Sequence, residues 1–178
     1  SISPACYYAR GRDFLYYVST GTKMWGRQEI YRRENVSRVE MWGVEADLDG
    51  MPVDGLKVNL NYSYNNPHVK DFDENPALNG KRLTYAPKNQ VKGYLLWTGG
   101  VVDAMFRGAY KSRQYTAEDN SASIDGFATW DIQVSRWFLR RRLYVGAEML
   151  NIFNNRHMNT KEYMSAGRLM NLKLALHL

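Results

Sequence analysis

Hydrophobic and polar residues alternate one by one along much of this chain. Between Leu56 and Asn65 every even-numbered residue is Leu, Val or Tyr, and every odd-numbered residue is Lys, Asn or Ser. Successive side chains of a strand point to opposite faces, so this segment has one apolar face and one polar face. A helix would scatter the same residues around its circumference, and the pattern therefore predicts a strand.

The same alternation recurs in other segments, with turn-forming residues between them. Residues 42–49 alternate before Leu56, and the connection 49–55 contains Asp, Gly and Pro, which predicts an antiparallel hairpin. Alternation returns in 104–111, 129–135, 143–149 and 170–178, while 2–19 and 90–98 are extended with less distinct faces. We therefore expect about eight strands and no helix.

The last predicted strand has the most regular pattern. Its one face carries Met170, Leu172, Leu174, Leu176 and Leu178, and its other face carries Asn171, Lys173, Ala175 and His177. A terminal strand with one oily and one polar face is typical of the strand that closes an outer-membrane β-barrel, where the oily face contacts lipid.

The predicted connections alternate in length. Short ones near 50–54, 99–102 and 139–142 alternate with long polar ones near 20–34, 65–88, 112–125 and 154–166. In an antiparallel meander this places every short turn at one end of the sheet and every long loop at the other. Outer-membrane barrels have short periplasmic turns and long external loops, whereas a soluble meander has no strong reason for such an asymmetry.

Composition fits this class and excludes others. The chain has 178 residues, of which 44% are hydrophobic and 13% aromatic, and its formal net charge is +6. It lacks the run of about 18 apolar residues that a membrane-spanning helix requires, but the half-apolar strands of a membrane barrel escape such a search. A single cysteine, Cys6, excludes an intrachain disulfide. Because the chain starts at Ser1 without a basic and apolar leader, we expect either a processed protein or a piece of a longer one.

Charged and amide side chains occupy the polar faces of the predicted strands. A basic residue that faces lipid at mid-membrane costs about 2–4 kcal/mol, whereas it costs little in a wet or plugged lumen. A soluble barrel would instead turn its apolar faces inward, and alternation alone leaves both arrangements open. On the membrane interpretation, the lumen-facing residues are Glu45, Asp47, Lys57, Asn59, Asn61, Arg107, Lys111, Asp131, Gln133, Glu148 and Lys173.

Four short strings, in matching order and spacing, resemble those of TonB-dependent outer-membrane receptors. Gly43-Val44-Glu45 follows a polar run that contains Asn35, and the string 82–89 contains Ala-Pro shortly before the next strand. The string 151–154 reads Asn-Ile-Phe-Asn, and Tyr163 is followed by Gly167-Arg168 and the final strand. The resemblance covers nearly the whole chain, most firmly residues 35–178. The terminal Leu178 departs from the Phe or Trp that usually ends the chains of this family.

The resemblance implies an all-β fold, an antiparallel transmembrane β-barrel. Family members close about 22 strands around a plug. Residues 1–178 would then be the C-terminal segment of such a barrel, about eight strands of it, with the plug and the N-terminal strands absent. The strand that closes the barrel would carry Leu172, Leu174, Leu176 and Leu178 on its outer face.

The resemblance also implies a function, TonB-dependent transport of a scarce solute across the bacterial outer membrane, and no enzymatic activity. A ferric siderophore is the first candidate solute, followed by cobalamin, haem or a glycan. The expected partners are a TonB-type energy-coupling protein acting through the plug, a solute such as a metal chelate, and outer-membrane lipid and lipopolysaccharide. No cofactor is expected. Nucleic acid is not expected either, because the basic run Arg140–Arg142 lies in a short turn without a stacking platform.

Polar residues of the long loops are the candidates for solute recognition. Receptors of this family often hold a metal chelate with loop His, Tyr and Arg, which here points to His68, Arg113, Tyr115, Arg156 and His157. No resident metal is predicted, because the three histidines are far apart in the sequence. The acidic loop that starts at Asp71 has Pro76 and Arg82 where a calcium loop requires Gly and Glu.

Two other function classes remain open from the sequence. A small independent eight-stranded barrel, in the outer membrane or soluble, would have a structural, adhesion or ligand-binding role, and its first and last strands would have to pair. A soluble enzyme or ligand-binding barrel would require an apolar cavity and a catalytic pair of side chains, and the sequence shows no such pair.

Overall fold

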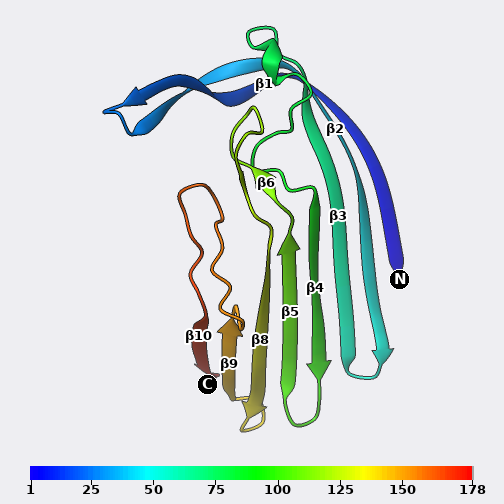
Figure 1. Cartoon of the computed structure of the whole chain (residues 1–178). Helices are drawn as coiled ribbons and strands as arrows, with labels where there is room; N and C mark the ends of the chain where they lie inside the picture. The colour runs from blue at the N-terminus through cyan, green and yellow to red at the C-terminus, as the bar shows by residue number, and fades with distance from the viewer. Residues whose placement is uncertain (178) are drawn as a thin grey trace.

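Eight antiparallel strands form one sheet in the order in which they follow along the chain (Figure 1). The computed structural model describes residues 1–177, and for Tyr16, Val36 and Ser37 the backbone only, so that Leu178 of the predicted closing strand lies outside the described residues. The strands are β1 (Ile2–Met24), β2 (Gln28–Val53), β3 (Leu56–Asp71), β4 (Asn89–Thr98), β5 (Asp103–Lys111), β8 (Phe127–Phe138), β9 (Leu143–Leu150) and β10 (Leu169–Leu176). The connections contain a small sheet of β6 (Gln114–Tyr115) and β7 (Ser123–Ile124) and one 3-10 turn, η1 (Pro76–Leu78). Among the described residues, no helix has the length and apolar character that crossing a bilayer requires.

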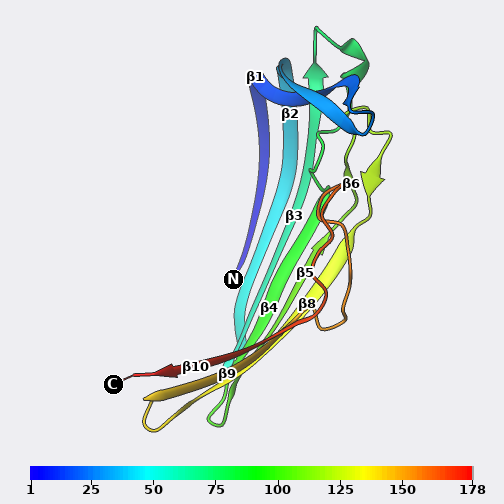
Figure 2. The ribbon, with the colours of Figure 1, turned by 90° about the vertical axis from the view of Figure 1, so that its left-hand side faces the viewer.

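The sheet is open, which contradicts the alternative of a small barrel closed on itself. β1 pairs with β2 and β10 pairs with β9, and in the described part of the chain β1 and β10 do not pair with each other. The sheet curves along its strands (Figure 2). The three turns predicted to be short, β2–β3, β4–β5 and β8–β9, lie at one end of the sheet, and the long connections β3–β4, β5–β8 and β9–β10 lie at the other (Figure 1).

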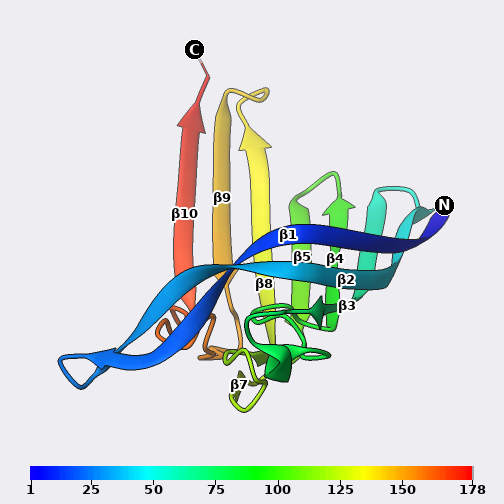
Figure 3. The same cartoon turned by 90° about the horizontal axis from the view of Figure 1, so that it is seen from above.

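The first long connection differs from its prediction. The sequence predicts a long polar connection near residues 20–34, but β1 continues to Met24 and β2 begins at Gln28, so that only a three-residue turn joins them. Trp25 and Gly26 adopt positive φ angles of 48° and 71°, which closes this turn. The long hairpin then extends across the loop end of the sheet (Figure 3). Polar residues form strands here because the backbone ladder needs no apolar face where both faces meet water.

The register aligns polar side chains of neighbouring strands on one face and apolar side chains on the other. Asp47 lies opposite Asn61 and Asn61 opposite Lys92, whereas Leu48 lies opposite Leu60 on the other face. The register also resolves the ambiguous strand β4, in which Leu95 and Trp97 belong to the apolar face. Leucines of the apolar face are not sealed in an interior, since Leu60 is 46% and Leu174 76% exposed. This result matches an oily face that is turned outward.

A small hydrophobic core lies at the loop end. It consists of Val18, Val39, Val69, Phe72 and Leu78, with Leu83 packed against it. Val39 and Val69 are in phase with Asp47 and Asn61, so the face that is polar along the middle of β2 and β3 becomes apolar at this end. The β3–β4 connection folds over this face and anchors the loops above the sheet, since Val69 donates to the Lys81 carbonyl at 2.9 Å.

Candidate functional site at the loop end

An open cleft of about 880 Å³ lies where four segments far apart in the sequence come together. One wall is the end of the β1–β2 hairpin, from Lys23 to Tyr31, and the opposite wall is the segment 160–162 between β9 and β10. Tyr85 of the β3–β4 connection and Glu118 beyond β6 complete the lining. The loops therefore form one shared concave surface rather than four separate projections.

Glu29 holds two walls of the cleft together. The Tyr31 hydroxyl donates to Glu29 Oε2 at 2.8 Å, and Lys161 Nζ lies 3.6 Å from the same oxygen. The hydrogen bond from Tyr31 and the ammonium of Lys161 lower the pKa of Glu29. The same hydrogen bond, together with burial, raises the pKa of Tyr31 to about 12. At neutral pH Glu29 is therefore charged and Tyr31 keeps its proton.

Glu118 is the second carboxyl group of this cleft, and it behaves differently. Burial raises the pKa of Glu118, and the nearby carboxylates of Glu29 and Asp119 add to this effect. Lys161 opposes the rise without cancelling it. The cleft thus combines cationic, anionic and phenolic groups, which suits a polar solute held by charge-assisted hydrogen bonds.

The five residues predicted to recognise solute do not line this cleft. Arg113 lies 3.5 Å from Asp125 in an exposed pair, and the Tyr115 carbonyl accepts from the backbone N–H of Tyr85 at 2.9 Å. His68 lies 3.8 Å from Glu40, on another face of the hairpin base. A Cβ built on Gly167 would lie 3.6 Å from Arg156 Nε, which places Arg156 at the approach to β10.

His157 contacts residues of its own loop and the first residue of β8. Its ring stacks on Phe127 with a centroid distance of 3.6 Å, and its Nδ1 lies 3.1 Å from Ser165 Oγ. Its Nε2 lies 3.2 Å from Asn159 Oδ1. The described residues contain no group of three or more His, Cys, Asp or Glu side chains that could hold a metal ion.

The cleft residues Glu29, Tyr31 and Lys161 are not indicated by the sequence pattern. They lie in polar stretches that the alternation predicts as loops, and the ion pair of Glu29 and Lys161 joins residues far apart in the chain. Residues 29–34 read Glu-Ile-Tyr-Arg-Arg-Glu, in which apolar and charged residues do not alternate one by one. That pattern is compatible with a solvated hairpin whose faces are both polar.

A second polar network lies on the polar face of the sheet. Arg107 Nη2 donates to Glu148 Oε1 at 2.8 Å and lies 3.4 Å from Asp131 Oδ2. Lys173 and Asn171 approach the other oxygen of Glu148 at 3.7 and 3.4 Å. Register places all the residues predicted to face the lumen on this one face: Glu45, Asp47, Lys57, Asn59, Asn61, Arg107, Lys111, Asp131, Gln133, Glu148 and Lys173.

Two of the four short strings described in the sequence analysis, 151–154 and 43–45, have structural roles in the sheet. The Asn151 side chain turns the chain out of β9. Its Nδ2 donates to the Asn155 backbone carbonyl, and its Oδ1 accepts from the Asn155 backbone N–H, both at 2.9 Å. Gly43 allows close approach, because a Cβ there would come within 2.4 Å of both the Tyr64 carbonyl and the Tyr7 hydroxyl. These strings therefore shape the walls and the loop exits and do not contact the cleft.

Comparison with known proteins gives one family and a consistent fold. The family model described as "TonB dependent receptor-like, beta-barrel" matches residues 2–152. The siderophore receptor PiuA from Acinetobacter baumannii superposes with a TM-score of 0.77 at 13% identity, over 98% of this chain and 26% of that one. The ferric-catecholate import receptor Fiu from E. coli K12 gives 0.75 at 14% identity, over 99% and 25%.

The copper transporter OprC superposes equally well, with a TM-score of 0.76 at 14% identity, over 98% of this chain and 28% of that one. The chain thus spans about a quarter of the length of these receptors. Sequence identities this low support a shared fold, but they do not indicate which solute this chain binds. No curated protein matches the chain.

Proposed function

Because the chain belongs to the TonB-dependent receptor-like β-barrel family of the bacterial outer membrane, we propose that it forms the C-terminal wall and loops of a receptor that imports a ferric siderophore. Two of the three receptors compared above are named for a siderophore or a ferric catecholate. Transport is a binding and gating function, and it requires no covalent chemistry from this segment.

The open edges of the sheet support the idea that further strands flank this segment. β1 and β10 each pair along one side only in the described chain. Inside a bilayer, each backbone N–H or C=O group without a hydrogen-bond partner costs several kcal/mol of folding free energy. This is about the penalty for burying any polar group without a partner. Both edges would be satisfied if strands of the same receptor pair with them and close the barrel.

The two faces of the sheet support an orientation across the membrane. The apolar face of β3 runs from Leu56 to Tyr64, a length close to the roughly 9–11 residues of a tilted transmembrane strand. The polar face carries the network of Arg107 and Glu148. With the apolar face on lipid and the polar face on the lumen, the charged groups remain hydrated or paired.

The loop-end cleft is the observation that carries the proposal. It lies at the end opposite the β2–β3, β4–β5 and β8–β9 turns, which is the external end of an outer-membrane barrel. Its mixture of Lys161, Glu29 and Tyr31 offers donors and acceptors for a polar chelate. The energy for import would come from a TonB-type protein acting on the plug of the complete receptor.

Uptake by the complete receptor tests this function. The full-length receptor is produced in a strain without other iron receptors, and uptake is measured for ⁵⁵Fe-labelled catecholate, hydroxamate and carboxylate chelates, with cobalamin, haem and copper alongside. We expect uptake of a ferric chelate that stops when the TonB-type protein is deleted. Uptake restricted to cobalamin, haem or copper would overturn the siderophore assignment, and uptake without the TonB-type protein would overturn the transport mechanism.

The cleft is tested in the same cells. Replacing Glu29 by Gln together with Lys161 by Met should weaken binding of the transported chelate. The matched control replaces Arg140 and Arg142 by Gln in the turn between β8 and β9, at the opposite end of the sheet, and should bind normally. Equal affinity of both variants for the chelate would remove the cleft from the proposal.

A further inference from the structure

The apolar face of β1, β2 and β3 changes character just beyond a group of aromatic residues. Tyr8, Trp42 and Tyr64 lie on this face, and the rings of Trp42 and Tyr64 pack at a centroid distance of 5.0 Å. Two residues further along each strand, the same face carries Arg10, Glu40 and, on β3, Asn66 followed by His68. Aromatic side chains that border charged ones mark the boundary between hydrocarbon and headgroups.

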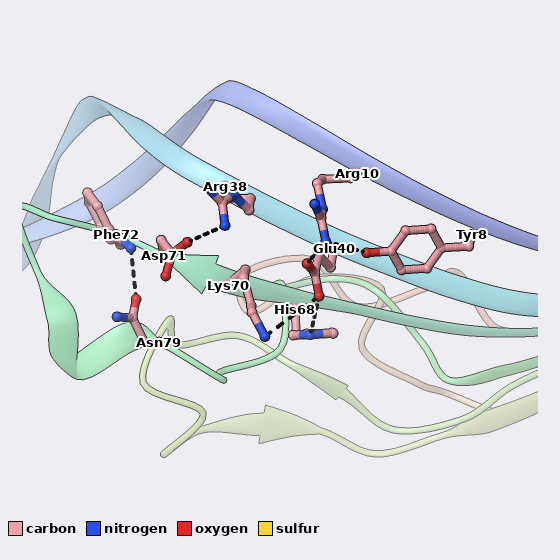
Figure 4. Close-up of polar contacts among 9 residues, drawn as sticks. All are labelled: Tyr8, Arg10, Arg38, Glu40, His68, Lys70, Asp71, Phe72 and Asn79. Atoms are coloured by element: carbon pink, nitrogen blue, oxygen red, sulfur yellow. Dashed lines mark hydrogen bonds and ion pairs between the residues drawn. The ribbon is translucent and has the colours of Figure 1, made fainter.

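Glu40 organises a cluster of basic side chains on this face (Figure 4). Arg10 Nη2 donates to Glu40 Oε1 at 2.9 Å. His68 Nε2 and Lys70 Nζ lie 3.8 and 3.9 Å from Glu40 Oε2. The Tyr8 hydroxyl also hydrogen-bonds to Glu40, which ties the aromatic group to the charged one.

The carboxylate is shielded while the cations remain accessible. The Glu40 side chain is 11% exposed, whereas those of Arg10 and Lys70 are 49% and 50% exposed. The cluster is continued by Arg38, which lies opposite Arg12 in the register and pairs with Asp71 at 3.0 Å. Four basic side chains, without counting His68, thus face two acidic ones, Glu40 and Asp71, which leaves an excess of two positive charges at the surface.

The position of this cluster relative to the bilayer decides what can reach it. Its face is continuous with the lipid-facing residues Val44 and Leu48 of β2. The opposite face is occupied at the same level by the core residues Val39 and Val69, so the cluster cannot turn toward the lumen. At about 3.3 Å per residue, Glu40 lies about 7 Å beyond Trp42 along the strand, within a headgroup layer that is about 5–8 Å thick on each side of the hydrocarbon.

We propose that Arg10, Arg12, Arg38 and Lys70 form a binding site for the phosphate groups of an outer-leaflet glycolipid, lipopolysaccharide. Guanidinium groups bind phosphate through paired N–H donors, and ammonium groups bind it as point charges. The aromatic residues below the cluster pack against the upper part of the acyl chains. The site depends on the outer-membrane location of the family and not on the solute that the receptor imports.

Lipid binding to the full-length receptor in nonionic detergent tests the site. Lipopolysaccharide is titrated and its bound fraction is read by native mass spectrometry for the wild type and for the variant Arg10→Gln, Arg12→Gln and Lys70→Gln. We expect binding to weaken about fivefold for each basic side chain removed, the equivalent of about 1 kcal/mol each. Arg38 is left in place because it pairs with Asp71.

A matched control removes the same charge elsewhere. The variant with Gln at Arg140, Arg141 and Arg142 loses three basic side chains in the turn at the other end of the sheet and should bind lipopolysaccharide like the wild type. Barrel assembly of every variant is verified by its heat-dependent mobility in SDS gels. Equal affinity of the Arg10, Arg12 and Lys70 variant and the wild type would overturn the proposal.

Wild-type protein with altered lipids tests the site without any substitution. Lipopolysaccharide stripped of its phosphates should bind at least about tenfold more weakly than the intact lipid if two or more phosphate contacts are lost. Undiminished binding of the dephosphorylated lipid contradicts phosphate recognition. Phosphatidylglycerol binding as tightly as lipopolysaccharide contradicts the assignment to a glycolipid.

Discussion

Glu29 and Lys161 connect the β1–β2 hairpin with the β9–β10 loop, through a Nζ to Oε2 distance of 3.6 Å. No backbone pairing joins these two segments in the described chain, so side chains must hold this wall of the cleft in place. Among the residues that the structure describes, this contact is the only ion pair between the hairpin and that loop.

Replacing Glu29 by Gln should loosen the hairpin. The substitution removes the charge that Lys161 faces and weakens the hydrogen bond from Tyr31, so the pKa of Tyr31 should fall toward its ordinary value of 10. Hydrogen exchange of the full-length receptor should become faster in residues 23–32 and 158–163 and stay unchanged in β4 and β5. An unchanged exchange rate in the hairpin would show that other contacts hold it.

The loop that carries Glu118 should loosen as pH rises. Because burial raises the pKa of Glu118 above its ordinary 4.5, the folded loop binds this proton more tightly than the unfolded loop does. The resulting stabilisation is complete below pH 4.5 and is lost as the pH rises through the raised pKa. Protection factors of residues 114–124, corrected for intrinsic exchange, should decline over this window.

The control for this pH effect is Glu118→Gln, which keeps the size of the side chain and removes its titration. Glu29, Asp119 and Lys161, the charged groups that act on Glu118, remain in this variant. We expect protection factors that no longer decline over the same pH window. A decline of the same size in the variant would assign the effect to another group.

Gly43→Ala should destabilise the barrel wall. A Cβ at this position would meet the Tyr64 carbonyl oxygen at 2.4 Å, and a backbone atom in a ladder cannot move aside. Forcing a methyl group into such a space costs about 1–3 kcal/mol of unfolding free energy. The control is Gly50→Ala on the same strand, where nothing lies within 4 Å of the added Cβ, and it should cost little.

Neighbouring residues of β3 distinguish the two faces of the sheet. Leu60→Arg places a charge on the apolar face and should lower the unfolding free energy of the receptor in lipid by about 2–4 kcal/mol. Asn61→Arg places the same charge on the polar face beside Asp47 and should cost far less. Urea unfolding of both variants in lipid vesicles gives the difference, and the opposite ranking would reverse the orientation proposed for the sheet.

Alternation of residue types predicted the strands in the middle of the sheet well, but not their ends. Strands β8, β9 and β10 lie within or close to the predicted segments. β2 and β3 continue well beyond them, to Gln28 and Asp71, because polar residues can pair in a ladder when no face needs to be apolar. The period-two signal therefore ended near Trp42 although the strand continued.

The solute-recognition role of the five predicted loop residues stays a prediction. The chemistry of the His68 and Arg113 side chains suits them to hold a chelate, and in the structure His68 lies beside Glu40 and Arg113 beside Asp125. Residue type indicates what a side chain can bind. It does not indicate on which surface of the folded protein the side chain lies.

Four short strings of the sequence resemble one family. The sequence by itself also determined the all-β class, the polar and apolar faces and the three turns at the end opposite the long loops. These features follow from local side-chain periodicity and turn chemistry, which act between residues that are close along the chain. Only the tertiary structure decided that the sheet is open, that Glu29 meets Lys161 across the cleft, and that Arg10, Glu40 and Lys70 gather on one face. Such contacts depend on strand register and on how loops pack over a curved sheet, and no local pattern encodes those distances.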